Sequence, residues 1–203
     1  MIDGLRRGLA RQLGLPSGRL GRVVATGLNR LNRDTNAVAL AALEVGGSHH
    51  AVDLGFGGGV GLRGLLEGPA ARVTGIDPSA DMLAAAARRY SHELAEGRLS
   101  LLEGDAGAIP LEDASADRLL SVHTLYFWPD PEAGMAELRR VTALYGRVCL
   151  AIQPREVMEG DPLHDHGFML YSAADLRRLL EGAGFAAVEV REGEERLLGM
   201  AER

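Results

Sequence analysis

Lysine is absent from this chain of 203 residues, because all 22 basic residues are arginines. A Walker A phosphate-binding loop needs a lysine that reaches the nucleotide phosphates, and Schiff-base enzymes need a lysine amine as their nucleophile. The absence of lysine therefore excludes P-loop nucleotidases, pyridoxal phosphate enzymes and other Schiff-base enzymes.

Cysteine is nearly absent, since Cys149 is the only one. A single thiol forms no disulfide within the chain and rules out zinc clusters built from several cysteines. Cys149 lies in the apolar run 147–152, so we expect a buried core residue. No apolar run approaches the roughly 20 residues that a membrane-spanning helix requires, and no signal-peptide pattern is seen. We predict a cytoplasmic protein without stable membrane insertion.

The formal charge of −6 is unevenly distributed. Residues 1–33 carry seven arginines and one acid, whereas the rest of the chain carries 15 arginines and 27 acids. The acidic remainder is poorly suited to general nucleic-acid binding, so we expect no nucleic-acid partner.

The arginine-rich segment also has helical periodicity, in Ile2, Leu5, Leu9 and Leu13. We predict that residues 1–44 form an N-terminal helical cap or lid. A helix packed on the surface of the main domain and a transit peptide are the alternatives. The remaining residues, 45–203, have the size of one compact domain.

Glycines stand at every second position after an apolar run that ends in an acid, in the segment Val-Asp-Leu-Gly-Phe-Gly-Gly-Gly. Glycine tolerates positive φ and lets another group approach the backbone closely. Gly55, Gly57 and Gly59 therefore predict a strand, a tight turn and a helix start built around a ligand. Asp53 would repel the pyrophosphate that a dinucleotide fingerprint places at this helix start. It suits a cationic group, such as an ammonium.

With this motif the sequence resembles the class I S-adenosylmethionine-dependent methyltransferases, whose first motif is an acid followed by Gly-x-Gly-x-Gly. Later segments resemble the family's further motifs in the same order: residues 73–79 with Met82, then 104–111, then 116–123. The resemblance covers residues 45–192. It is greatest to the small-molecule branch that includes the ubiquinone and menaquinone biosynthesis methyltransferases.

Strand and helix signals alternate after residue 34, which is typical of a parallel sheet covered on both faces. We expect strands at 51–54, 72–76, 99–102, 117–122, 147–152, 185–190 and 196–200, and helices at 34–43, 59–66, 79–96, 132–142 and 172–182. The resemblance implies an α/β, Rossmann-like sheet, mostly parallel, in the order 3-2-1-4-5-7-6 with strand 7 antiparallel.

The resemblance also implies S-adenosylmethionine as the cofactor. Asp77 would accept hydrogen bonds from both ribose hydroxyls, Asp105 would bind the adenine amino group, and Asp53 would favour the ammonium. The adenine plane would lie between Pro78 and Met82. The cofactor-binding residues expected on this basis are Asp53, Gly55, Gly57, Gly59, Asp77, Pro78, Met82, Asp105, Ala106 and His123.

The sequence says less about which residues contact the methyl acceptor. Tyr126 and Trp128 lie in an aromatic cluster after the fourth strand, where they would border a planar or apolar small molecule, although a hydrophobic plug against the next helix explains them equally well. His123 is a candidate base if the acceptor has a proton to lose. His164 and His166 lack a third ligand, so we expect no metal site.

We conclude from the sequence that the chain is a methyltransferase acting on a small molecule, with an unassigned catalytic residue. Two alternatives stay open. A nicotinamide oxidoreductase would also use Asp77 on a ribose, although Val60 stands where the third glycine of that fingerprint belongs. A domain that binds S-adenosylmethionine without catalysis is the other. Phe56 replaces a small residue of the family motif, and we expect it to narrow the cofactor entrance.

Overall fold

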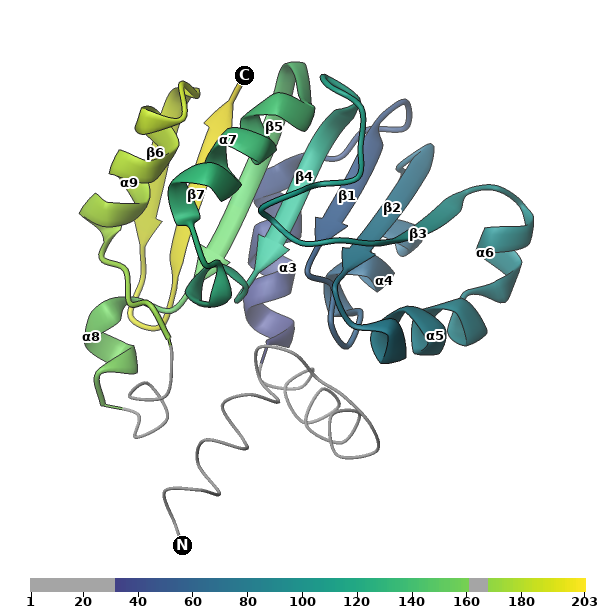
Figure 1. The fold of residues 1–203 in the computed structure, drawn as a ribbon, viewed down its shortest axis with the longest axis horizontal. Helices are drawn as coiled ribbons and strands as arrows, with labels where there is room; N and C mark the ends of the chain where they lie inside the picture. The colour runs from purple at the N-terminus through teal and green to yellow at the C-terminus, as the bar shows by residue number, and fades with distance from the viewer. Residues whose placement is uncertain (1–31, 161–167) are drawn as a thin grey trace, which may run out of the picture.

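A computed structural model of the chain describes residues 32–160 and 168–203. Its centre is a seven-stranded sheet in the order β3-β2-β1-β4-β5-β7-β6 (Figure 1). The strands are β1 (His50–Leu54), β2 (Arg72–Asp77), β3 (Leu99–Glu103), β4 (Ala116–Val122), β5 (Thr142–Ile152), β6 (Ala186–Glu192) and β7 (Leu197–Glu202). Only β7 runs antiparallel to its neighbours β5 and β6. The expected strand order and direction are confirmed.

Helices cover both faces of the sheet. The helices α7 and α9 lie in front of the sheet in Figure 1, and α3 and α4 lie behind it. The helical elements are α3 (Arg33–Leu43), α4 (Val60–Glu67), α5 (Ala80–Arg89), α6 (Ser91–Ala95), the 3-10 turn η1 (Leu125–Phe127), α7 (Pro131–Val141), α8 (Arg155–Met158) and α9 (Ala173–Gly182). Among the residues described, no helix is long and apolar enough to cross a membrane.

Two hydrophobic clusters, one on each face, hold the layers together. All five residues of β1 are buried, as expected for a strand with helices on both sides. Val52 belongs to the cluster with α7 and α9, and Ala51 belongs to the cluster with α3 and α4. Cys149 is fully buried, and burial raises the pKa of its thiol to about 12. The prediction of a buried core cysteine is confirmed.

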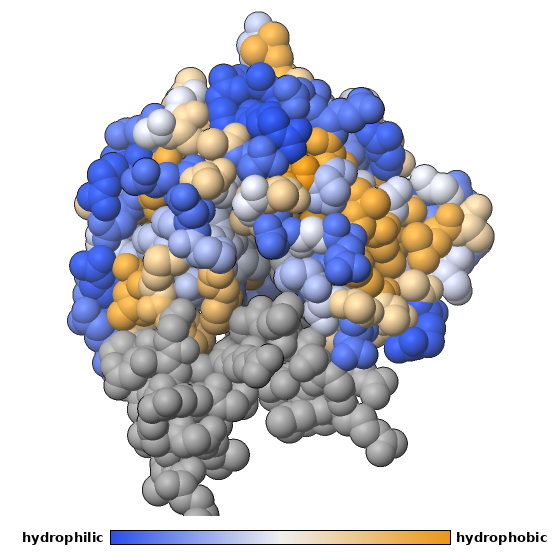
Figure 2. All heavy atoms as spheres, in the orientation of Figure 1, coloured by the Kyte–Doolittle hydropathy of each residue, from blue (hydrophilic) through white to orange (hydrophobic). Residues whose placement is uncertain are grey.

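One connection between parallel strands lacks a helix. The chain passes from β3 to β4 through residues 104–115, where no helix is formed. Figure 2 shows hydrophobic residues in orange over this side of the viewed face, around β2, β3 and the connection that follows β3. Ile109 is buried and Leu111 is partly buried against the core cluster on this face, so the connection itself serves as the covering layer.

The predicted helix over 79–96 is wrong in its length. It begins as expected, because Ser79 Oγ accepts a hydrogen bond from the Met82 amide, but it divides into α5 and α6 at Tyr90. Tyr90 has φ −112° and ψ 34°, outside the helical range, and its side chain is buried in the core cluster that contains Met82. Burial of this ring accompanies the change in chain direction.

The segment before the first strand is described only in part. In α3, Ala39 and Leu43 are fully buried and pack in the cluster behind the sheet. The apolar residues on which the lid prediction depends, Ile2 to Leu13, lie outside the described residues. Arg33–Leu43 is thus a packed layer of the fold, whereas the lid stays a prediction.

Candidate functional site

The carboxyl ends of the six parallel strands lie at one edge of the sheet, the lower edge in Figure 1. Leu54 pairs with Ile76, and Asp77 pairs with Glu103, so β1, β2 and β3 end side by side. Val122 pairs with Ala151 at the ends of β4 and β5. In an open α/β sheet this edge is where ligands bind, next to the point where strand order reverses.

The glycine-rich turn after β1 has the backbone that its sequence predicts. Gly55, Gly57 and Gly59 have φ of 73°, 49° and 78°, values that residues with a Cβ rarely adopt. The Gly55 amide donates to the Ile76 carbonyl at 2.7 Å, and Gly59 is the N-cap residue of α4. Gly55 also permits a close approach, because a Cβ there would lie 2.5 Å from Thr124 Cγ2.

Asp77 connects this turn to the end of β2. Its Oδ2 accepts a hydrogen bond from the Gly57 amide at 2.7 Å, and its Oδ1 accepts one from the Ser79 amide at 2.9 Å. Burial raises the pKa of Asp77, and the two amide donors oppose the rise. Each carboxylate oxygen still has a further lone pair, so Asp77 can tether the turn and accept ligand hydroxyls at the same time.

Asp53 lies beneath the turn. The side chain is on the face of the sheet that α3 and α4 cover, and its residue is only 3% exposed. The Leu62 amide donates to the carboxyl, while Oδ2 has no hydrogen-bond partner among the described residues. Burial, together with the nearby Asp77, raises the pKa of Asp53 to about 7. Asp53 is therefore partly protonated near neutral pH.

Buried polar atoms without a partner gather around this turn. Two buried side-chain polar atoms of the described residues lack a partner, Asp53 Oδ2 and Tyr90 Oη. Each lies at the first turn of α4: Asp53 Oδ2 is 2.7 Å from the place of a Cβ on Gly61, and Tyr90 Oη is 3.8 Å from that of Gly59. Unsatisfied polar groups are rare in protein interiors, and here they gather where the sequence predicts the cofactor.

The other predicted cofactor residues lie around the same strand ends. Pro78 and Asp105 are exposed, and Asp105 Oδ1 accepts a hydrogen bond from the Gly107 amide at 2.9 Å. Ala106 and Met82 are buried at 5% and 2% exposure. Met82 belongs to the core cluster behind the sheet, so only Pro78 of the expected adenine sandwich offers an exposed surface.

Phe56 does not have the position expected for it. Its Cδ1 lies 3.0 Å from where a Cβ of Gly75 would be, and its residue is 6% exposed. The ring therefore fills the space that Gly75 leaves on β2. The expectation that Phe56 narrows the cofactor entrance is wrong, because the ring anchors the turn from below.

Trp128 likewise faces the protein interior. It is 5% exposed, and its Cε3 lies 2.6 Å from where a Cβ of Gly134 in α7 would be. The structure thus favours the hydrophobic plug over the predicted acceptor contact for this residue, since glycine in α7 makes room for the indole.

Tyr126 and His123 form a hydrogen-bonded pair at the end of β4. His123 has a positive φ of 56°, and its ring stacks on Tyr126 with centroids 6.1 Å apart. Its Nδ1 lies 3.2 Å from Tyr126 Oη. The Gln153 amide donates to the same hydroxyl oxygen. Gln153 directly follows β5, and this position was the signal by which the sequence could have identified it.

These contacts favour one tautomer of His123. The hydroxyl oxygen of Tyr126 accepts the Gln153 proton, and its own proton has an acceptor in contact if it is donated to His123 Nδ1. Nδ1 is then unprotonated, and the proton of the neutral ring is on Nε2. Burial lowers the pKa of His123 to about 4, which keeps the ring neutral. In this tautomer Nε2 carries the proton and can donate a hydrogen bond.

Further aromatic rings extend this cluster. Phe127 and Phe168 lie with ring centroids 4.8 Å apart, and Tyr126 lies 6.0 Å from each of them. Phe168 is distant in the sequence and carries no motif, so sequence reasoning missed it. Among the described residues no group of acids, histidines and cysteines could hold a metal. His164 and His166 lie outside the described residues.

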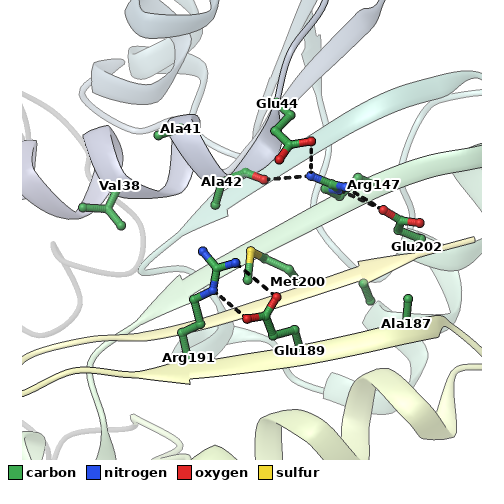
Figure 3. Close-up of a pocket in the computed structure, with 11 residues that line it drawn as sticks. Val38, Ala41, Ala42, Glu44, Arg147, Ala187, Glu189, Arg191, Met200 and Glu202 are labelled. Atoms are coloured by element: carbon green, nitrogen blue, oxygen red, sulfur yellow. Dashed lines mark hydrogen bonds and ion pairs between the residues drawn. The ribbon is translucent and has the colours of Figure 1, made fainter.

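A separate hollow of about 490 Å³ opens between α3 and the strands β5, β7 and β6 (Figure 3). Its arginines are already paired: Arg147 lies 2.8 Å from Glu44 and 2.7 Å from Glu202, and Arg191 lies 2.7 Å from Glu189. None of its lining residues belongs to the glycine-rich turn. We therefore assign it no part in the site.

Comparison with known proteins agrees with this geometry. Residues 52–150 match the family described as Methyltransferase domain. The chloroplastic 2-methyl-6-phytyl-1,4-hydroquinone methyltransferase of Arabidopsis thaliana is 36% identical over 100 residues, which cover 49% of this chain and 28% of that protein. The uncharacterized methyltransferase YdaC of Bacillus subtilis is 26% identical over 161 residues, 79% of this chain and 84% of that protein.

The extent of these matches differs. The chain spans about a third or less of the length of several curated relatives. Among solved structures, a SAM dependent methyltransferase from Aquifex aeolicus superposes with a TM-score of 0.72 and 20% identity, covering 89% of this chain and 97% of that chain. At this identity the likeness shows the fold alone.

The close approach at Gly55 has a measurable effect on stability. Gly55→Ala and Gly97→Ala place an alanine at nearly the same φ, 73° and 72°, but only position 55 has a neighbour within 4 Å. Gly97→Ala should cost about 1–2 kcal/mol of backbone strain, and Gly55→Ala more. Urea denaturation measures both. Thr124→Ser removes the clashing methyl and should rescue Gly55→Ala; equal costs at the two glycines would contradict the clash.

The tautomer of His123 is accessible to NMR. We expect nitrogen shifts of the ring to show a proton on Nε2 from pH 6 to pH 8, with no titration until the pH approaches 4. Tyr126→Phe removes the hydroxyl donor and should admit the Nδ1-protonated form, while Phe127→Leu, a change in the neighbouring ring, should not. A proton on Nδ1 in the unaltered protein would contradict the assignment.

Proposed function

We propose that the chain is a class I S-adenosylmethionine-dependent methyltransferase, as its match to the methyltransferase domain supports, and that it transfers a methyl group from this cofactor to a small organic acceptor. The observation that carries the proposal is the glycine-rich turn with three positive φ values, tethered to Asp77 at the end of the neighbouring strand. Neither an oxidoreductase nor a purely binding domain gains support from the comparisons.

The residues present suit both the adenosine portion and the amino-acid portion of the cofactor. We propose that Asp77 accepts hydrogen bonds from the ribose hydroxyls while it holds Gly57, and that exposed Asp105 and Pro78 receive the adenine. The Gly55 turn allows close approach of the amino-acid portion. The bound cofactor supplies an electrophilic methyl group on a sulfonium. The chain contributes alignment of donor and acceptor, which can lower a barrier by roughly 7–11 kcal/mol.

We propose that the acceptor side is bordered by His123, Phe127 and Phe168, with Tyr126, which is 3% exposed, packed behind them. We propose a planar or apolar acceptor, because stacked aromatic rings favour such molecules. The hydroquinone methyltransferase among the relatives supports this class. With the proton on Nε2, we propose that His123 offers a hydrogen-bond donor rather than a base. The cytoplasmic location stays a prediction from the sequence.

Calorimetry tests the proposed function. S-adenosylmethionine and S-adenosylhomocysteine should both bind to the full chain, and NADH should neither bind nor compete. Binding of NADH without binding of the sulfonium would reject the assignment. Production of S-adenosylhomocysteine from S-adenosylmethionine with a panel of hydroquinones and related phenols would then distinguish an enzyme from a binding domain.

Asp77→Ala should weaken binding of S-adenosylhomocysteine about tenfold or more, since hydrogen bonds to a charged acceptor contribute about 1.5–3 kcal/mol. Loss of the hydrogen bond to Gly57 would also weaken binding. Two ligands that differ only in their ribose hydroxyls therefore separate this effect from the contact with the ribose. The unaltered protein should prefer adenosine to 2′,3′-dideoxyadenosine, and Asp77→Ala should not discriminate between them. A preference retained in the variant would show that Asp77 does not reach the ribose.

A further inference from the structure

Asp53 and Asp77 place two carboxyl groups on the same face of the sheet, within the protein. Asp53 pairs in register with Gly75, and Asp77 stands two residues further along β2, so both side chains project toward the layer of α4. Their residues are 3% and 4% exposed. Asp77 is satisfied by two amide donors, whereas Asp53 Oδ2 has no partner among the described residues.

Among the residues that the structure describes, no cation compensates the charge of Asp53. From α4 it receives the Leu62 amide, and from β2 it faces the charge of Asp77. From α3 it faces Asn36, an uncharged residue, and from β4 the methyl groups of Leu120; Asn36 Oδ1, Leu120 Cδ2 and Asp53 Oδ2 all lie within 3 Å of the place of a Gly61 Cβ. An ionised Asp53 would thus be a buried charge beside a like charge, which is costly.

Asn36 offers the protonated form an acceptor. Its Nδ2 donates to the Asn32 carbonyl at 2.8 Å, which leaves Oδ1 directed toward the space beside Asp53 Oδ2. A proton on Oδ2 could therefore be donated toward Asn36 Oδ1 across this space, whereas an ionised Oδ2 would face another acceptor. The local geometry favours the neutral carboxylic acid as long as no positive charge is nearby.

We propose that Asp53 determines the charge preference of the cofactor site: it holds a proton in the free protein and releases it to the solvent when the cationic cofactor binds beside Asp77. The inference rests on the proposed function. The O–H bond of the carboxyl breaks, the proton passes to the buffer, and the resulting carboxylate stabilises the positive ligand without touching it. Asp53 thus acts through charge, and is a positioning rather than a contacting residue.

The expected size of the effect follows from Coulomb's law. If the ligand's positive charge lay about 8 Å from the carboxylate, an effective dielectric constant of about 20 would give a rise of about 30-fold in its acid dissociation constant. With the pKa of the free protein's Asp53 at about 7, binding of S-adenosylmethionine should release about two thirds of a proton at pH 6.5 and almost none at pH 9. The affinity should be about five- to tenfold lower at pH 6 than at pH 8.

Calorimetry in buffers of different ionisation enthalpy counts the released protons. Asp53→Asn is the decisive variant, because its Oδ1 can accept the Leu62 proton and its amide can donate to Asn36. The cofactor's own amino group titrates near pH 8, and the difference between the two proteins cancels that contribution. Glu67→Gln, which removes an exposed acid from the far end of α4, should behave like the unaltered protein.

Three ligands vary the charge while keeping the nucleoside. S-adenosylmethionine should release the most protons, S-adenosylhomocysteine, which lacks the sulfonium charge, should release fewer, and adenosine none. In Asp53→Asn the number of protons released should no longer differ between these ligands, except for protons that come from the ligand's own amino group. If the variant folds poorly, the infrared band of the protonated carboxyl in the unaltered protein, lost on addition of S-adenosylmethionine, provides a second measurement.

The outcomes separate the inference from the proposed function. Tight binding of S-adenosylmethionine with the same proton count in the unaltered protein and Asp53→Asn would overturn the inference and leave the function intact. Failure of the unaltered protein to bind either S-adenosylmethionine or S-adenosylhomocysteine would overturn both. A proton release that depends on Asp53 and increases with ligand charge would establish the inference.

Discussion

The hydrogen bond from the Gly57 amide to Asp77 is the interaction on which the site depends. It joins the turn after β1 to the end of β2, and a carboxylate acceptor makes it stronger than a bond between neutral groups. With Gly57 held, Gly59 reaches the N-cap of α4, and the Phe56 ring enters the space above Gly75. The glycines and the acid are thus parts of one arrangement, which explains why their spacing is so informative.

The same arrangement places acids where they weaken the fold. Asp53 and Asp77 are buried near one another, and Asp53 has an oxygen without a partner. A carboxyl whose pKa is raised on folding favours the native state at low pH and loses that contribution as the pH rises. The apolar layers on both sides of β1 offset this cost. Such a cost at one edge of an otherwise well-packed sheet is typical of a site shaped for a ligand.

The sequence predicted correctly those features that depend on the backbone conformation and on the order of strands and helices. Alternating strands and helices, glycine spacing and acids at strand ends located the turn and its neighbours within one or two residues. It failed for the side-chain direction of Phe56 and left that of Trp128 open, because the receiving glycines, Gly75 and Gly134, lie on other elements. Gln153 and Phe168 were missed for the same reason: each joins the site through packing between segments that are distant in the sequence.

Methyl transfer from a sulfonium removes a positive charge from the site, so electrostatics that favour binding also oppose the reaction. Interactions accelerate a step only if they are stronger in the transition state than in the ground state. Two permanently ionised buried acids would stabilise the charged donor most and its neutral product least. Asp77 is tied to amides and keeps its role, whereas Asp53 can exchange its charge for a proton. On the proposed proton exchange at Asp53, a site with one acid held by amides and one that can take up a proton would bind the cationic donor. It would then release the neutral product more readily.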